Sequence, residues 1–183
     1  MALALLAAVC VVAATLVLVW LHLQPTGLRW WSDAVSDYGT TAVHFGYRAM
    51  VVLFGAGGLL LALALDRRTA AAGIGWLWAY GVSRVAIAAF MTDRDPSSPT
   101  REGRIHWLLA TTAFTSIALA GSRIDWPGAP AILPTAGHVV VASAVATLLT
   151  RLLAPLRPLF GAAERLLYAS TIAWLLIAAL ALA

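Results

Sequence analysis

The residues best suited to acid–base or metal chemistry lie in one polar segment, residues 91–106. Asp93, Asp95 and His106 place two carboxylates and an imidazole there. These donor types bind divalent ions and carry general acid–base catalysis. The Asp-x-Asp spacing is common by chance, and a carboxylate before a proline is also typical of a turn. We therefore name all three as metal-ligand candidates, and Asp93 and His106 as catalytic candidates, while pairing of Asp93 with an arginine stays open.

A second polar segment, residues 32–40, contains another catalytic candidate, Asp37. Its neighbours Ser36 and Tyr38 could line the rim of a ligand pocket. Serine, threonine and aspartate also favour the first positions of helices, where their oxygens accept free backbone N–H groups. The segment therefore predicts either a pocket rim or a helix cap, and Asp33 fits the cap better.

Two arginines fall inside apolar runs, where a charge is costly. Arg84 lies seven residues before Met91, which places it about 10 Å inside the predicted helix end. An arginine at membrane depth costs about 2.5–3.5 kcal/mol on insertion scales and usually faces the bundle interior. We expect Arg84, or the shallower Arg48, to pair with Asp37 or Asp93, or to hold an anionic head group.

The elements that must position these groups are membrane helices. Hydrophobic residues make up 62% of the 183 residues and charged residues only 11%, whereas soluble domains carry about 25% charged residues. A helix needs about 20 mostly apolar residues to cross the hydrocarbon core. The sequence predicts an all-α, polytopic transmembrane bundle of six helices in a single domain, 1–183, with both termini on one side. The predicted spans are 2–23, 45–65, 70–91, 105–121, 132–153 and 159–183.

The predicted loops divide the charged residues very unequally. Six of the eight acidic residues and most arginines fall on the face formed by the first, third and fifth loops. The ligand-binding candidates on this face are Arg48, Arg84, Ser36, Tyr38, Glu164 and Arg165. Because arginine-rich short loops favour the cytoplasm, the count places this face inside and both termini outside.

Several function classes are disfavoured. The net charge of +4 comes from arginines at the ends of apolar runs, which indicates topology signals and ion pairs, not nucleic-acid binding. The single cysteine, Cys10, excludes an intrachain disulfide. Three histidines share one face while His138 lies near the other, so axial haem pairs are not expected. No nucleotide-binding motif is present, and a divalent metal stays open.

Four segments together carry a resemblance to a known family. They are the exit from the first span, Leu21-His22-Leu23-Gln24-Pro25-Thr26-Gly27, the loop Asp33…Ser36-Asp37-Tyr38-Gly39, the stretch Thr92-Asp93-Arg94-Asp95-Pro96…His106, and the start of the last span, Gly161…Glu164-Arg165. In order and spacing the chain resembles the DUF998 family of bacterial integral membrane proteins, and more distantly Frag1/DRAM-like proteins. The chain departs from the family at Met91-Thr92, where Phe-Pro is frequent. The resemblance implies a six-helix fold in the bacterial plasma membrane, and no activity or site residue.

Three hypotheses for function remain. The polar face could handle a membrane lipid, with or without enzymatic chemistry. It could instead be the vestibule of a small-solute transporter, although transporters usually break their helices near the midplane. The charges could also serve only to hold the helices of an accessory, structural subunit together. Membrane lipids are the partners expected in each case.

Overall fold

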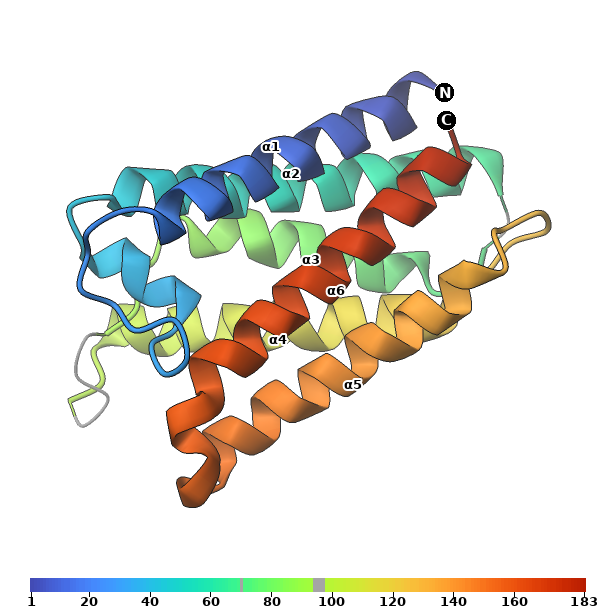
Figure 1. Cartoon of the computed structure of the whole chain (residues 1–183). Helices are drawn as coiled ribbons and strands as arrows, with labels where there is room; N and C mark the ends of the chain where they lie inside the picture. The colour runs from blue at the N-terminus through green and yellow to red at the C-terminus, as the bar shows by residue number, and fades with distance from the viewer. Residues whose placement is uncertain (70, 94–97) are drawn as a thin grey trace.

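The computed structural model describes residues 1–69, 71–93 and 98–183, and these form an all-α bundle. The elements are α1 (Ala2–His22), η1 (Val35–Thr40), α2 (His44–Arg68), α3 (Ile74–Ile87), α4 (Arg101–Arg123), α5 (Ile132–Leu152), η2 (Ala154–Leu159) and α6 (Phe160–Ala181). The α-helices run alternately up and down, so that both termini lie at the same end of the bundle (Figure 1). The predicted polytopic helical bundle is confirmed.

The helices differ in whether they can cross a membrane. Five segments of the described chain are long and apolar enough: Ala2–His22, His44–Arg68, Arg101–Arg123, Ile132–Leu152 and Ala154–Ala181. The third helix, α3, has only 14 residues, a length of about 21 Å against a hydrocarbon core of about 30 Å. The predicted span at 70–91 therefore differs from the structure, in which regular α-helix is confined to Ile74–Ile87.

Both ends of α3 have a local cause. Gly73 precedes the helix with a φ of +82°, a left-handed conformation that glycine adopts without steric cost. Beyond Ile87 the chain tightens into i→i+3 hydrogen bonds, from the N–H of Ala89 to Ala86 and from that of Phe90 to Ile87. Such turns are common where a helix ends, and they carry the chain away from α-helical geometry.

Each α-helix packs on the next in the chain, and α6 closes the bundle against α1 and α2. Two of these contacts are made by glycines. A Cβ on Gly55 of α2 would lie 2.8 Å from the carbonyl oxygen of Gly81 in α3, and one on Gly121 of α4 would lie 3.1 Å from Cα of Gly137 in α5. Small residues allow membrane helices to approach this closely.

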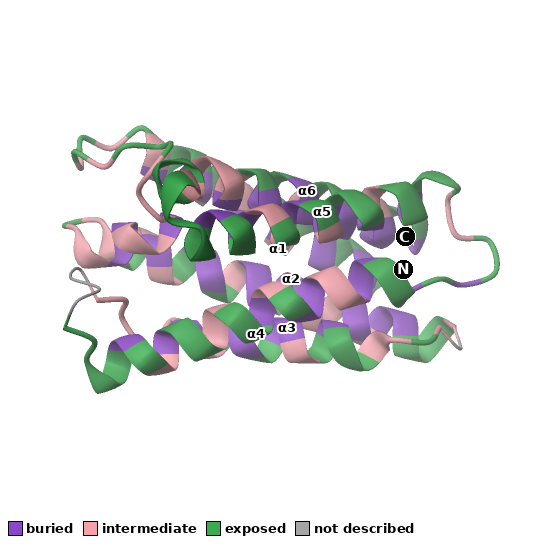
Figure 2. Cartoon of the chain, turned by 90° about the horizontal axis from the view of Figure 1, so that it is seen from below, coloured by how far each residue is buried: buried purple, intermediate pink, exposed green. Residues whose placement is uncertain are grey.

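The outer surface is apolar along the helices. Buried residues line the interior of the bundle and exposed residues cover its outside (Figure 2). Large apolar side chains such as Leu16, Val82 and Leu148 are exposed. A continuous apolar outer surface on long helices suits lipid and not water, so the chain is an integral membrane protein.

Candidate functional site

The guanidinium group of Arg84 is enclosed by aromatic rings inside the bundle. Its Cζ lies 4.8 Å from the ring centre of Tyr168, 5.6 Å from that of Phe114 and 5.8 Å from that of Phe54. The residue is only 2% exposed. Three rings from three different helices therefore surround one cation.

The position of Arg84 in its helix differs from the sequence prediction. Because α3 ends at Ile87, Arg84 is in the last turn, about 4.5 Å from the helix end and not about 10 Å. The surrounding rings are nevertheless deep. By helical rise, Phe54, Phe114 and Tyr168 lie about 15, 20 and 12 Å from the polar-end starts of α2, α4 and α6. The end of α3 is thus recessed within the bundle.

No carboxylate neutralises this arginine in the described part of the chain. The single ion pair found there joins Arg29 to Asp33 at 3.6 Å, on the surface. The predicted pairing of Arg84 with Asp37 or Asp93 is therefore wrong. The buried Nε of Arg84 has no hydrogen-bond partner among the described residues.

Two further arginines of the polar end have unused buried donors. Arg48 of α2 donates from Nη2 to Sδ of Met91 at 3.3 Å, while its Nε has no described acceptor. Arg165 of α6 donates from Nε to His22 at 2.7 Å and from Nη1 to the carbonyl of Asp33 at 2.9 Å. Its buried Nη2 has no described acceptor. Helices α2, α3 and α6 thus each contribute a guanidinium group with a buried N–H that no described residue accepts.

Carboxylates of the same end are occupied by backbone N–H groups of the first loop. Asp37 accepts a 2.8 Å hydrogen bond from the N–H of Ala34, and Glu164 accepts one of 2.7 Å from the N–H of Val35. Burial raises the pKa of Asp37, and the hydrogen bond from Ala34 opposes that shift. Asp37 caps the start of η1 locally, and Glu164 of α6 anchors η1 to the bundle.

The other candidate residues of the first loop differ in how far they are buried. Tyr38 is buried, with its ring 5.4 Å from that of His22, and Ser36 is half-buried. Burial acts to raise the pKa of Asp33, but hydrogen bonds from the N–H of Arg29 and the hydroxyl of Ser32 outweigh it and hold that pKa below its ordinary value.

Asp93 lies in the loop before α4 and binds Thr100, the N-cap residue of that helix. Its oxygens accept from the N–H of Thr100 at 3.0 Å and from the Thr100 hydroxyl at 2.6 Å. That hydroxyl oxygen in turn accepts from the N–H of Gly103 at 3.0 Å, which is N-capping by a threonine. Asp93 therefore supports the cap.

His106 is buried in α4 and faces the unwound segment after α3. Its Nδ1 lies 2.9 Å from the carbonyl oxygen of Phe90, which can only accept, so the proton is assigned to Nδ1 and Nε2 keeps its lone pair. Its ring centre is 6.4 Å from that of Tyr47. No group of three or more possible ligand side chains is found among the described residues. Asp95 lies outside those residues, so the metal site stays a prediction.

Sequence reasoning missed the aromatic enclosure. Tyr47, a further tyrosine that acts electrostatically on Arg84, and Phe54 stand seven residues apart in α2, two helical turns, and therefore share a face. Tyr168 follows Glu164 by four residues in α6 and shares its face for the same reason. The spacing of these aromatic residues can be read from the sequence. Only the tertiary structure shows that these helix faces surround Arg84.

Comparison with known proteins identifies the family of this chain, but no individual relative. No curated protein and no solved structure matches the chain. A family model described as a protein of unknown function, DUF998, matches residues 5–181. Because the match spans nearly the whole bundle, from α1 to α6, the chain belongs to the DUF998 family.

Proposed function

We propose that this protein binds the anionic head group of a membrane lipid at the polar end of its bundle, with Arg84 at the centre of the site. One observation carries the proposal: Arg84 is a 2%-exposed cation with an unpartnered Nε and no carboxylate partner in the described chain. An ionisable residue inside a membrane protein is costly and is a functional candidate for that reason.

The aromatic rings explain part of the stability of this charge. A cation over a ring face gains about 2 kcal/mol when both are desolvated. The rings of Phe54, Phe114 and Tyr168 can stabilise the positive charge, and the hydroxyls of Tyr80 and Tyr168 lie within hydrogen-bonding reach of the guanidinium, but Nε has no described acceptor. A phosphate or carboxylate would satisfy that donor, because guanidinium groups bind such anions with two parallel hydrogen bonds.

Arg48 and Arg165 support an anion of lipid origin. Their buried donors, which no described residue accepts, belong to the same end of the bundle as Arg84, and we expect this end to lie at the membrane boundary. An anion with several oxygens could accept from more than one of these groups. We place the binding of a head group above catalysis, because Asp37, Asp93 and Glu164 already accept backbone N–H groups.

A second candidate, transport of a small anionic solute, is favoured by the short α3. Transporters place their sites at helices that break within the membrane, and non-helical backbone at that depth is tolerated only beside protein or water.

We further propose that the polar end faces the cytoplasm of a bacterial cell. With Cys10 replaced by alanine, a cysteine at Arg157 should resist an impermeant thiol reagent applied outside cells, and one at Asp125 should react.

The lipid retained by the purified protein tests the main proposal. Native mass spectrometry of the wild type should show a preference for phosphatidylglycerol over phosphatidylcholine with the same acyl chains. Arg84→Gln should weaken that binding about tenfold, the loss expected for one charged hydrogen bond. Arg157→Gln, an exposed arginine of the same end, is the matched control and should bind as the wild type.

If Arg84→Gln does not fold, Arg48→Gln provides an independent test. It removes another donor that no described residue accepts, and its side chain is only half-buried. Weaker phosphatidylglycerol binding by Arg48→Gln supports the head-group site. Unchanged lipid binding in both variants contradicts it and favours the accessory role. Binding of inorganic phosphate with no lipid preference would favour solute transport instead.

A further inference from the structure

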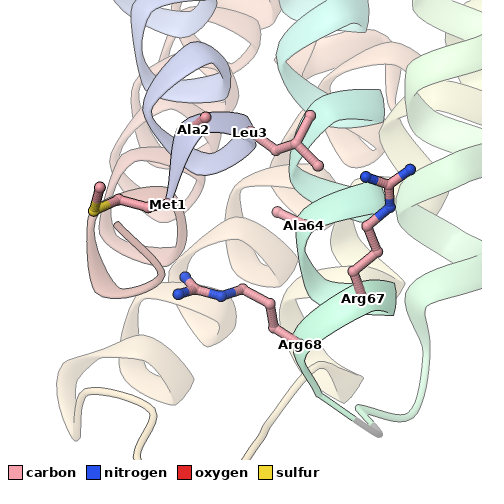
Figure 3. Close-up of a pocket in the computed structure, with 6 residues that line it drawn as sticks. All are labelled: Met1, Ala2, Leu3, Ala64, Arg67 and Arg68. Carbon is pink, nitrogen blue, oxygen red and sulfur yellow. The ribbon is translucent and has the colours of Figure 1, made fainter.

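The end of the bundle opposite the Arg84 site, beside the two termini, is hollowed at its surface. A hollow of about 240 Å³ opens there between the start of α1 and the end of α2. It is lined by Met1, Ala2, Leu3, Ala64, Arg67 and Arg68 (Figure 3). We infer that this hollow binds an anionic phospholipid of the leaflet opposite the Arg84 site.

The walls of the hollow are suited to the apolar part of a lipid. Leu3 and Ala64 project into the space between α1 and α2, and Met1 borders it on the side of α1 (Figure 3). Helix α2 has no charged residue between Arg48 and Asp66 and then ends in two arginines, so the hollow lies where a membrane core gives way to the head-group layer. A glycerol backbone and the first carbons of an acyl chain match such a boundary.

The guanidinium groups extend from the end of α2 in different directions. Arg68 reaches toward Met1, whereas Arg67 extends away from it on the other side of Ala64 (Figure 3). Arg68 also donates to the carbonyl of Leu182, so it ties α2 to the end of α6. No described residue accepts a hydrogen bond from Arg67, and Asp66 forms no ion pair with either arginine among the described residues.

Charge complementarity selects the occupant. Arginines beside an apolar recess at the membrane boundary recognise anionic head groups through phosphate. A neutral or zwitterionic lipid would add no net negative charge beside two cations. Arginines are also common at helix C-termini, where they offset the helix dipole, and in short loops, where they set topology. Neither role needs a hollow beside the arginines.

The test is a lipid titration of the chain 1–183 after removal of any tag, because Met1 lines the hollow. It is done in the Arg84→Gln background, or in Arg48→Gln where Arg84→Gln does not fold, so that loss of the other site cannot be mistaken for loss of this one. Native mass spectrometry should show phosphatidylglycerol bound in preference to phosphatidylcholine. Arg67→Gln should weaken that binding about tenfold, and Arg67→Lys should keep most of it.

Arg123→Gln is the matched control, since Arg123 is exposed at the same end, at the close of α4. Its binding should equal that of the parent protein. Equal losses in Arg67→Gln and Arg123→Gln would overturn the inference, because they would show general electrostatic attraction. Undiminished binding in Arg67→Gln would also overturn it, and so would an Arg67-dependent thermal shift with inorganic phosphate alone.

Discussion

Nε of Arg165 in α6 donates a 2.7 Å hydrogen bond to Nε2 of His22, the last residue of α1. The other ring nitrogen, Nδ1, lies 2.7 Å from the carbonyl oxygen of Leu18 and must donate to it. The imidazole is therefore neutral, with its proton at Nδ1. The contact joins two helices far apart in the sequence, and the same guanidinium holds the first loop through the carbonyl of Asp33.

Replacing Arg165 by lysine should destabilise the bundle although the charge is kept. A lysine cannot reproduce the fork that donates to His22 and Asp33 together. We expect a loss of about 1–3 kcal/mol in the free energy of unfolding, measured by thermal or denaturant unfolding in detergent. Arg157→Lys, at an exposed position of the same end, is the control.

A double-mutant cycle shows whether the histidine contact carries this effect. His22→Ala and Arg165→Lys together should cost less than the sum of the single losses, with a coupling energy of at least about 0.5 kcal/mol. Strict additivity would mean that Arg165 acts only through the backbone carbonyls.

Asp37→Asn should change how stability depends on pH. Because burial raises the pKa of Asp37 in the folded protein, the unfolded chain loses this proton at a lower pH than the folded chain. The stability contributed by this group is present below the unfolded pKa and is lost as the pH rises through the folded pKa. Asparagine does not titrate, and its carbonyl can still accept from Ala34.

The asparagine variant should therefore gain stability relative to the wild type as the pH rises from acid to neutral, and the gain should level off above the folded pKa. Unfolding midpoints at a series of pH values measure the difference. A relative gain that instead increases toward acid pH would contradict this assignment.

Gly137→Ala should disrupt the packing of α5 on α4. A Cβ at this position would meet the carbonyl of Gly121 in the facing helix, and backbone cannot move aside as a side chain can. We expect a loss of about 1–3 kcal/mol from overpacking, measured as a lower unfolding midpoint. Gly75→Ala in α3 is the control, because nothing lies within 4 Å of its added Cβ, and its midpoint should be unchanged or higher.

Thr100→Ala should weaken the start of α4. It removes the oxygen that caps the N–H of Gly103 and the hydroxyl that donates to Asp93. The expected cost is about 1 kcal/mol, and Thr100→Ser should restore most of it. A loss of lipid binding in Thr100→Ala without any loss of stability would show that Asp93 serves more than the cap.

The fold was predictable because hydropathy alone identifies long apolar helices. The exception is α3, whose apolar stretch continues past Ile87 although the helix does not. Hydropathy measures how well residues suit lipid, and it does not detect where hydrogen bonding changes from i→i+4 to i→i+3. The distance predicted between Arg84 and the end of its helix was wrong for this reason, although Arg84 does lie deep in the bundle.

The candidate site was predictable in composition but not in pairing. The sequence placed Arg84, Glu164 and Arg165 on one polar end, where the structure has them. It also predicted that arginines would find carboxylates. The backbone N–H groups of Ala34, Val35 and Thr100 take those carboxylates instead. Every residue except proline carries such a group, so the sequence does not reveal which of them will bind a carboxylate.

The most direct test of the central claim is the proximity of Arg84 to lipid phosphorus in a bilayer. Solid-state NMR would measure the dephasing of ¹⁵N-arginine signals by ³¹P, in the wild type and in Arg84→Lys, with phosphatidylglycerol present. The account predicts a strongly dephased guanidinium signal that disappears in Arg84→Lys. A wild-type spectrum in which the Arg84 signal is not dephased by phosphorus would contradict it.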